Sequence, residues 1–364
     1  MKLALTGNEA AAYAIEQINP DVLAAFPITP TTQVMEILTK KKMEKKITSE
    51  IILSESEHSA MSSVISATAA GARSMTATSS QGLALMHEML HIASGLFLPI
   101  VMIVGARALS SPINIHNDHS DVMSQSATGW IQLYAETVQE AYDNTIQAIK
   151  ISENPDLQIP IMVIMDGFIT THQMTSVEVL TTSQVQKFVG SFKPIDYLLD
   201  LKNPLTIGGF AMPDQYSDVK DEQHKRIKNS KKIILSVSSE YNKLCKKGFK
   251  IIEEFGNKLA KTAIVAQASV CGTIKNALKD NKTVKLVKVN LFRPFPQKEV
   301  TEVLKDCNRV IVIDRAYSFD GIGGPLYKEI QALNLKSKID DHVIGLGGNN
   351  ISEKNILQIL NDKL

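Results

Sequence analysis

The sequence predicts an α/β fold of two domains, each built on a mainly parallel sheet. From residue 20 onward, short apolar segments alternate with stretches of helical periodicity, which is the pattern of consecutive βα units. Most of these segments are rich in Val, Ile or Met, as expected of strands that are covered on both faces. The chain has 364 residues, a length that favours two compact units, each with its own core.

In the first half of the chain, the apolar segments predict a run of strands. They are Val22 to Phe26, Ile51 to Leu53, Ser74 to Ala77, Pro99 to Val104, Trp130 to Tyr134 and Pro160 to Met165. Between about 175 and 230 the periodicity fades, and polar residues end in the charged run Lys220 to Lys232. We interpret this segment as a linker, so the first domain is expected at residues 1–230 and the second at residues 231–364.

The second domain is predicted to be a smaller α/β unit. Its expected strands are Ile233 to Val237, Thr262 to Ala266, Val284 to Val289, Arg309 to Ile313 and Val343 to Leu346. The helical stretches between and after them are expected around 239–255, 272–280, 297–306, 324–333 and 352–362. This alternation again indicates a parallel sheet.

Composition excludes several classes of function. The formal net charge of +1 provides no field to hold nucleic acid or an anionic membrane. The longest apolar run, Leu96 to Ala106, has about half of the roughly twenty residues that a membrane span needs. Cys245, Cys271 and Cys307 form no CxxC pair, so no disulfide framework, zinc site or iron-sulfur site is supported. We expect a cytoplasmic protein without a signal peptide.

The segment from Phe26 to Thr32 ends a predicted strand and begins a helix. Thr29 is placed as the helix N-cap with Pro30 at the first helical position, which alone would explain both residues. The carboxyl ends of parallel strands are also where α/β proteins bind ligands, and a helix N-terminus presents free N–H groups to an anion. A substrate that carries a carboxylate would therefore fit at Thr29.

Two acidic residues follow the next strand. Glu55 and Glu57 lie at the expected start of a helix, where carboxylates commonly offset the macrodipole. On sequence statistics alone that structural interpretation is the stronger one. The small residues behind them, Ala69 to Ala72, indicate close packing against another element and favour an interface.

Residues 87–91 read HEMLH and match the HExxH pattern of zinc proteases. In such enzymes the two histidines, one turn apart, bind one metal while the glutamate acts as base. Here no third His follows at the spacing of that class, and the next Glu after Glu88 is Glu136. We therefore disfavour zinc hydrolysis.

Arg107 directly follows an apolar strand and begins a polar loop. That loop contains Asn114, His116, Asn117, Asp118, His119 and Asp121. Its length favours a functional role, although a hydrogen-bonded loop packed on a neighbour is the more ordinary interpretation of its His and Asp residues. A guanidinium at a strand end is well suited to hold a carboxylate through two parallel hydrogen bonds.

Several segments carry a family resemblance. They are TGNEAAAYAIEQINPDVLAAFPITP (6–30), SESEHSAMSSVISATAAGARSMTATSSQGLALMHEMLHIASG (54–95), ALSSPINIHNDHSDVMSQ (108–125), GWIQLYAE (129–136), DGFITTH (166–172) and VNLFRPFP (289–296). In this order they closely resemble the alpha subunit of multi-subunit pyruvate:ferredoxin oxidoreductases. The resemblance covers nearly the whole chain, and the family carries HEMLH as an ordinary helix segment.

The resemblance implies a pyrimidine-type thiamine-diphosphate domain followed by a domain similar to the transketolase C-terminal domain. In such enzymes the cofactor lies between a pyrimidine domain and a diphosphate domain. This sequence has no GDG followed about thirty residues later by NN, which is the family's diphosphate and magnesium motif. The resemblance therefore implies that a partner, the beta subunit, binds the diphosphate and Mg²⁺, and that gamma and delta subunits carry the iron-sulfur clusters.

By motif matching, Glu57 takes the place of the glutamate that binds N1′ of the aminopyrimidine ring. A charge-assisted hydrogen bond there favours the imino tautomer, whose nitrogen takes the proton from thiazolium C2. Thr29 matches the family's substrate-contacting threonine, and Arg107 matches the arginine that holds the substrate carboxylate.

Two positions depart from the family pattern. Gly105 and Ala106 stand where the family often has an asparagine, and His116 stands where an aromatic residue is frequent. Both departures lie near the expected substrate loop, so they bear on the identity of the substrate.

We expect a subunit that acts only with its partners. The complex should convert pyruvate and coenzyme A to acetyl-CoA and carbon dioxide while reducing ferredoxin, and the reverse carboxylation is open in principle. Two alternatives stay open: the same chemistry on 2-oxoisovalerate, 2-oxoglutarate or oxalate, and a non-catalytic scaffold subunit.

Overall fold

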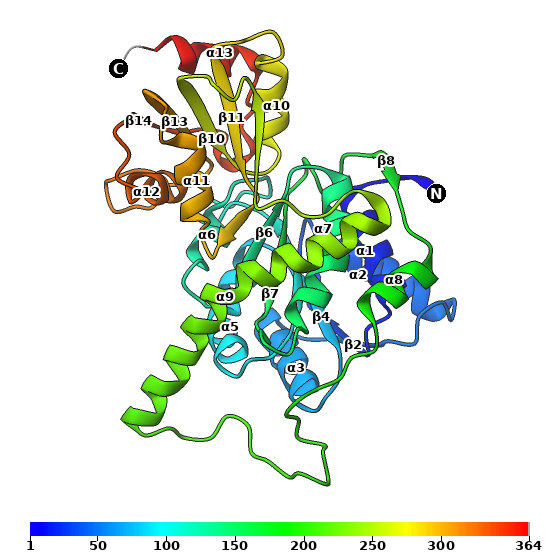
Figure 1. The fold of residues 1–364 in the computed structure, drawn as a ribbon. Coiled ribbons are helices and arrows are strands. Elements are labelled where there is room, and N and C mark those ends of the chain that lie inside the picture. The colour runs from blue at the N-terminus through cyan, green and yellow to red at the C-terminus, as the bar shows by residue number, and fades with distance from the viewer. Residues whose placement is uncertain (363–364) are drawn as a thin grey trace.

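The computed structural model describes residues 1–362, which form three sheets with helices around them (Figure 1). The seven-stranded sheet has the order β12-β6-β7-β5-β4-β2-β3, in which only β12 runs antiparallel to its neighbour. Its strands are β2 (Val22–Ala25), β3 (Glu50–Leu53), β4 (Ser74–Thr78), β5 (Val101–Ala106), β6 (Ile131–Ala135), β7 (Ile161–Asp166) and β12 (Leu291–Arg293). The prediction of an α/β fold is confirmed.

Helices cover both faces of this sheet. One face carries α1 (Gly7–Ile18), α2 (Thr32–Met43), α7 (Val138–Ser152) and α8 (Thr182–Val189), and the other carries α3 (Glu57–Ala69), α4 (Ser80–Leu85), α5 (His87–Gly95) and the short α6 (Ser120–Ser124). Strand residues alternate between the two cores: Ile103 faces the α1 side, whereas Met102 and Val104 face the α3 side. A two-stranded antiparallel sheet, β1 (Lys2–Leu5) with β8 (Thr175–Glu178), lies beside the first core.

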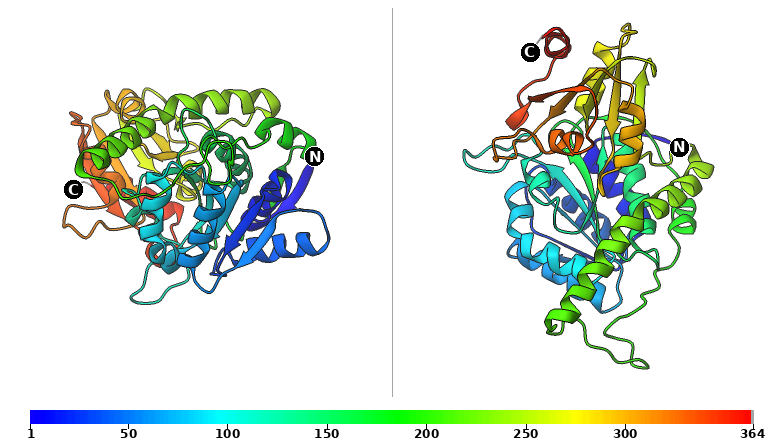
Figure 2. Two further views of the ribbon diagram at one scale, coloured as in Figure 1. Left: turned by 90° about the horizontal axis from the view of Figure 1, so that it is seen from below. Right: turned by 60° about the vertical axis from the view of Figure 1, so that its left-hand side comes forward.

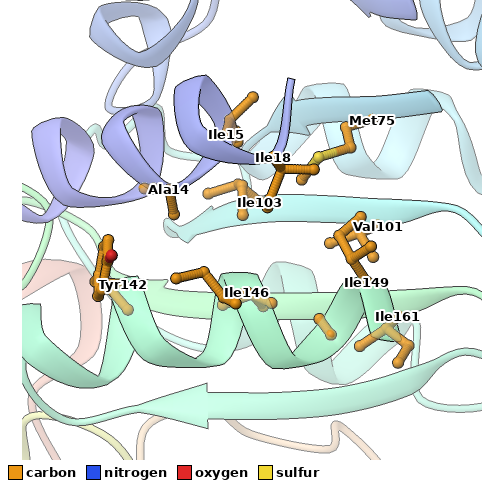
Figure 3. Close-up of a cluster of buried hydrophobic side chains, with 14 of the residues drawn as sticks. Ala14, Ile15, Ile18, Met75, Val101, Ile103, Tyr142, Ile146, Ile149 and Ile161 are labelled. Atoms are coloured by element: carbon orange, nitrogen blue, oxygen red, sulfur yellow. The ribbon is translucent and has the colours of Figure 1, made fainter. Parts of the chain in front are cut away.

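The first core is built from the apolar faces of α1 and α7. Figure 3 shows Ala14, Ile15 and Ile18 of α1 gathered with Ile146 and Ile149 of α7 over the central strands. These side chains are almost completely buried. Their helical spacing, with apolar residues three and four apart, explains why these stretches form helices against the sheet.

The five-stranded sheet has the order β14-β13-β10-β11-β9, with β9 antiparallel to β11 and the other pairs parallel. Its strands are β9 (Ile252–Gly256), β10 (Thr262–Ala266), β11 (Val284–Val289), β13 (Arg309–Asp314) and β14 (Lys338–Val343). Its helices are α10 (Val270–Ala277), α11 (Gln297–Leu304), α12 (Pro325–Gln331), the 3-10 turn η1 (Leu346–Gly348) and α13 (Glu353–Asn361).

The two larger sheets are joined by β12, which directly follows β11 but pairs with β6 of the other sheet. Phe292 of β12 is fully buried and lies edge-on to Tyr134 of β6, with ring centroids 6.2 Å apart. One apolar cluster therefore runs from the α3 face of the first sheet into the second.

The charged segment before the second sheet is not a loop. Residues from Pro213 to Cys245 form one helix, α9, of 33 residues, so the expected strand at Ile233 to Val237 is wrong. Its buried positions, Ser230, Ile234, Val237 and Tyr241, follow helical spacing. In Figure 1 and the right-hand panel of Figure 2, the N-terminal half of α9 and the loop before it extend beyond the body.

Other element predictions fared differently. The strands expected at Thr262 to Ala266 and Val284 to Val289 are confirmed to the residue, whereas the strand expected at Val343 to Leu346 lies earlier, at Lys338–Val343. The helix expected around 239–255 ends at Cys245 and is followed by β9. The domain boundary at residue 230 stays a prediction, and α9 runs across that residue. Within residues 1–362, no helix is long and apolar enough to cross a membrane.

Candidate active site

The predicted site residues follow neighbouring parallel strands. Thr29 follows β2, Glu57 follows β3 and Arg107 follows β5, with β4 between β2 and β5 in the sheet. Because these strands are parallel, the three residues lie at the same edge of the sheet, where α/β proteins bind ligands.

Glu57 is the first residue of α3, and Ser56 caps that helix by accepting a hydrogen bond from the Ser59 N–H at 3.2 Å. The Glu57 residue is only 6% exposed, and its carboxylate makes no hydrogen bond or ion pair with any of residues 1–362. Burial of a charged group without a partner is costly. The free N–H groups and dipole of the helix N-terminus offset part of that cost.

Gly82 of α4 leaves the room that Glu57 occupies. A Cβ atom at Gly82 would lie 2.5 Å from Oε1 and 2.7 Å from Cγ of Glu57, and 2.7 Å from Oγ1 of Thr78. These separations are below van der Waals contact, so any side chain at residue 82 would displace Glu57. The glycine is therefore part of the site.

Thr29 is exposed and does not cap the helix that follows it. The helix α2 begins at Thr32 with Thr31 at the N-cap position, so the placement of Thr29 as N-cap and Pro30 as first helical residue is wrong. Thr31 instead contacts the strand-end turn of β4, with its Oγ1 3.1 Å from Oγ of Ser79. Thr29 is thereby left free to face a ligand.

Arg107 is buried and holds two turns of the chain together. Its Nη1 donates to the carbonyl of Thr29 at 3.0 Å, and its Nε donates to the carbonyl of Asn114 at 2.9 Å. Burial lowers the pKa of the Arg107 guanidinium, and the nearby Asp121 carboxylate acts in the opposite direction. Its Nη2 has no hydrogen-bond partner in the described part of the chain.

Asp121 fixes the backbone on which Arg107 stands. Its fully buried carboxylate accepts from the backbone N–H groups of Ser80 at 2.8 Å, Arg107 at 3.0 Å and Val122 at 2.7 Å. Burial raises the pKa of Asp121 to about 8, although the three N–H donors act to lower it. The sequence placed Asp121 only in a polar loop, because no local pattern identifies a carboxylate that joins two distant strand ends.

The second sheet holds the loop that follows Arg107. Asn114 Nδ2 donates to the carbonyl of Gly347 at 3.1 Å, and the Gly348 N–H donates to the carbonyl of Asn117 at 2.6 Å. Nearby, a cleft of about 590 Å³ opens between the loop and the second sheet, with Ser110 and Tyr317 among its lining residues.

A buried ionic cluster also joins the seven-stranded sheet to the five-stranded one. Asp166, at the end of β7, is 2.8 Å from Nε2 of His119 and 3.1 Å from Nη1 of Arg315, and it also accepts from Ser269. Burial opposes ionisation of Asp166, but His119 and Arg315 outweigh it and hold the pKa of this carboxyl well below its usual range. The cluster ties the first sheet to β13 and β10.

The geometry brings Thr29 and Arg107 into direct contact, whereas Glu57 is separated from them by the turn after β4. Ser79 in that turn contacts Thr31, and Gly82, two residues into α4, lies against Glu57. The three predicted residues thus border one stretch of the sheet edge.

The two departures from the family pattern have packing reasons. A Cβ at Gly105 would lie 2.8 Å from Cγ2 of Thr31 and 2.9 Å from Cγ of Pro30, so side-chain packing favours glycine there. His116 packs on Phe168, with ring centroids 5.1 Å apart, so it fills an aromatic contact.

The HEMLH segment lies on α5, where His87 and His91 pack edge to face with ring centroids 5.0 Å apart. Among the residues that the structure describes, no group of three or more His, Cys, Asp or Glu side chains has the arrangement of a metal site.

Comparisons with known proteins agree on one family. Residues 13–239 match the family model described as pyruvate flavodoxin/ferredoxin oxidoreductase, thiamine diphosphate-binding, and residues 260–356 match the pyruvate:ferredoxin oxidoreductase core domain II. Pyruvate synthase subunit PorA of Methanocaldococcus jannaschii is 43% identical over 98% of this chain and 93% of the relative. The subunit of the same name from Thermotoga maritima is 42% identical over 100% and 94%.

A solved structure shares the fold. The 2-oxoglutarate:ferredoxin oxidoreductase from Magnetococcus marinus, with 2-oxoglutarate, coenzyme A and succinyl-CoA bound, superimposes with a TM-score of 0.74 at 20% identity. The match covers 99% of this chain but 64% of that one, so the chain described here spans less than two thirds of the length of that structure.

Proposed function

This chain belongs to the pyruvate flavodoxin/ferredoxin oxidoreductase family, and from that premise we propose that it is the pyrimidine-binding, substrate-orienting subunit of a pyruvate:ferredoxin oxidoreductase. The complete enzyme would convert pyruvate and coenzyme A to acetyl-CoA and carbon dioxide. The two electrons that are released would pass to ferredoxin, and a cytoplasmic location is part of the proposal.

The observation that carries this proposal is the position of Glu57. Its carboxylate is buried at a helix N-terminus, has no partner within residues 1–362, and lies in space that Gly82 leaves open. A buried acceptor of this kind suits a ligand that brings its own donor. An aminopyrimidine ring that carries a proton at N1′, as in its imino tautomer, offers such a donor, so the residues fit thiamine diphosphate.

When bound, thiamine diphosphate supplies the carbanion that attacks a 2-oxo group and the electron sink for decarboxylation. In our proposal Glu57 accepts the hydrogen bond at N1′ and so controls the protonation of the exocyclic amine. The low polarity around a nearly buried carboxylate strengthens that bond.

The substrate side of the proposed site is Arg107 with Thr29. Arg107 already donates through Nε and Nη1 to backbone carbonyls, which fixes the plane of the guanidinium. Its Nη2 is then available to a substrate carboxylate, and burial makes that charged hydrogen bond stronger than it would be in water. The exposed Thr29 lies next to this guanidinium, because its carbonyl accepts the hydrogen bond from Nη1 of Arg107.

The other half of the cofactor site is proposed to come from a partner. Since this sequence has no GDG motif for a diphosphate and Mg²⁺, we assign those contacts to a beta subunit. Gamma and delta subunits with iron-sulfur clusters would take the electrons, which agrees with the absence of any CxxC pair in this sequence.

The test is Glu57→Gln in the reconstituted complex. Glutamine keeps the size of the side chain but cannot act as the carboxylate, so pyruvate oxidation should fall by roughly two to four orders of magnitude. The matched control is Glu55→Gln, because Glu55 is exposed and hydrogen-bonds only Ser59 among residues 1–362.

Activity within a few-fold of wild type for Glu57→Gln would favour the scaffold alternative over the catalytic one. Assay of the wild-type complex on pyruvate, 2-oxoisovalerate, 2-oxoglutarate and oxalate then decides the substrate. We expect the highest kcat/KM with pyruvate.

A further inference from the structure

Two threonines of β4 have buried hydroxyl groups without a hydrogen-bond partner. Thr76 and Thr78 are 2% and 0% exposed, and neither Oγ1 atom forms a hydrogen bond within residues 1–362. The alternate residues of the strand, Met75 and Ala77, belong to the core on the α1 side, so both threonines face α3 and α4. A buried hydroxyl without a partner costs free energy, and each of these two positions therefore needs a reason.

The core on the α3 side offers these hydroxyls no partner. Met61 and Val64 of α3 and Leu83 of α4 are fully buried in it, and such side chains neither donate nor accept useful hydrogen bonds. Threonine is β-branched and suits a strand, which is a sufficient reason for Thr76. Thr78 has a further neighbour.

Thr78 differs from Thr76 because it lies beside Glu57. A Cβ atom at Gly82 would lie 2.7 Å from Oγ1 of Thr78 and 2.5 Å from Oε1 of Glu57, so the two oxygens border the same small space. Glu57 is 6% exposed, and its carboxylate also has no partner within residues 1–362. An unpaired hydroxyl that can donate is therefore next to an unpaired carboxylate that can only accept.

The backbone that carries Thr78 is firmly held. Thr78 is the last residue of β4, and in the turn that follows, the Ser80 N–H donates to the buried Asp121 carboxylate at 2.8 Å. Oγ of Ser80 donates to the carbonyl of Ala108 at 2.6 Å. Ser80 is left-handed, with a φ of +48°, which is uncommon for a residue other than glycine. With this backbone fixed, a rotation of the two side chains alone can bring the hydroxyl to the Glu57 carboxylate.

We propose that Thr78 is a positioning residue for Glu57: its hydroxyl donates to one carboxylate oxygen and orients the other toward the aminopyrimidine. This inference rests on the proposed function of Glu57. A charge-assisted O–H···O⁻ bond would satisfy both unpaired groups at once. It would also restrict the rotation of the Glu57 side chain, which is how a neighbouring residue preorganises a catalytic group.

The test compares Thr78→Val with Thr76→Val in the reconstituted complex. Valine has nearly the shape of threonine and lacks only the hydroxyl. Thr78→Val should lower kcat for pyruvate oxidation by roughly ten- to a hundredfold, which is the range for a lost hydrogen bond to a charged group. Thr76→Val should keep the wild-type kcat, and Thr78→Ser, which restores the hydroxyl, should recover most of the lost rate.

Two measurements do not depend on turnover. Removing an unpaired hydroxyl from an apolar core does not weaken folding, so both valine variants should keep or raise the thermal midpoint of the wild-type chain. The dissociation constant of thiamine diphosphate should rise roughly two- to tenfold in Thr78→Val but not in Thr76→Val. Isothermal titration calorimetry of the cofactor-free complex with Mg²⁺ measures it. A merely structural threonine would alter the thermal midpoint and leave this constant unchanged.

A double variant tests whether Thr78 acts through Glu57. In a Glu57→Gln background, Thr78→Val should lower kcat by less than about twofold, because the carboxylate that Thr78 orients is already gone. A full additional loss in the double variant would show that Thr78 acts independently of Glu57 and would overturn the proposal.

The outcomes separate this inference from the proposed function. Wild-type kcat and cofactor binding in Thr78→Val, beside an inactive Glu57→Gln, would overturn the role of Thr78 and leave the proposed function standing. An active Glu57→Gln would overturn both. Equal losses in Thr78→Val and Thr76→Val, or no recovery in Thr78→Ser, would show that the shape of the strand face matters and not the hydroxyl, which also contradicts the proposal.

Discussion

The side chain of Asn114, in the loop after β5, donates a hydrogen bond to the carbonyl of Gly347, in the turn η1 after β14, at 3.1 Å. The carbonyl of the same asparagine accepts from Nε of Arg107 at 2.9 Å. Gly347 has a φ of +58° and no room for a side chain, since its Cβ would lie 2.6 Å from Nδ2 of Asn114. The turn η1, which follows the five-stranded sheet, therefore helps to fix the guanidinium that we assign to the substrate carboxylate.

Asn114→Ala tests this connection. The substitution removes the hydrogen bond to Gly347 and the acceptor for the His116 N–H, each typically contributing about 0.5–1.5 kcal/mol. We expect a roughly two- to tenfold rise in the KM for pyruvate with little change in kcat. Asn203→Ala is the control, because the Asn203 side chain bonds only to Asp200 among the described residues; an equal rise there would contradict a specific role for Asn114.

Gly82→Ala should disable the complex without unfolding the chain. The new methyl group would collide with Oε1 and Cγ of Glu57 and push the carboxylate from its place. Misplacement of a catalytic group by about 1 Å can cost roughly a hundredfold in rate, and we expect a kcat loss of that order.

The matched control for Gly82→Ala is Gly95→Ala. At Gly95 the nearest atom to a Cβ is Nζ of Lys220, 3.6 Å away, so this variant should keep wild-type kcat and thermal stability. If both glycine variants lose activity together, the close fit around Glu57 is not the cause.

Arg107→Ala and Arg107→Lys separate charge from geometry in the proposed substrate contact. Loss of a charged hydrogen bond of about 1.5–3 kcal/mol predicts a roughly 10- to 150-fold rise in the KM for pyruvate in the alanine variant. Lysine should recover only part of this, because it lacks the planar fork. Competition by pyruvamide, which has no carboxylate, should change much less; an equal effect on both ligands would argue against carboxylate binding.

Most strands were predictable because each is a short apolar run between polar segments. The two edge strands of the five-stranded sheet, β9 and β14, were not. Strand β14 reads KIDDHV, and its polar residues reflect a position at the edge of that sheet. The run from Ile233 to Val237 resembles a strand because it is short and apolar and contains three β-branched residues. Its place in α9 depends on burial every three or four residues over a longer range, from Ser230 to Tyr241.

The candidate site could be predicted from the sequence where its residues directly follow a predicted strand. Thr29, Glu57 and Arg107 follow β2, β3 and β5. The strand pattern indicated Thr29 and Arg107, whereas Glu57 was indicated by the family resemblance alone. The roles of Asp121 and Gly347 could not be predicted, because they depend on contacts with residues far away in the sequence, which no local pattern encodes.

Lys288 of β11 should be essential for the contact between the five-stranded sheet and the residues that follow β6. It is 1% exposed and contacts Glu136 at 2.8 Å, Glu140 at 2.6 Å and Glu253 at 3.1 Å. Lys288→Met keeps much of the volume but removes the buried cation that the three carboxylates share, although Glu136 keeps Lys275 and Glu253 keeps Lys250. Breaking a buried ion pair from one side costs about 3–5 kcal/mol, so the free energy of unfolding in urea at neutral pH should fall by about that amount.

The pH dependence of stability gives an independent check on Lys288. Burial disfavours the charged form of Glu253, but Lys288 and Lys250 outweigh it and lower its pKa from 4.5 to about 2. A carboxyl whose folded pKa is depressed stabilises the protein above its unfolded pKa, and that stability is lost as the pH falls from 4.5 toward 2. Urea unfolding across this range should show a clear acid loss in wild type and a smaller one in Lys288→Met. Parallel pH profiles for the two proteins would show that Glu253 is held by other groups, and the difference at neutral pH would then have to come from packing alone.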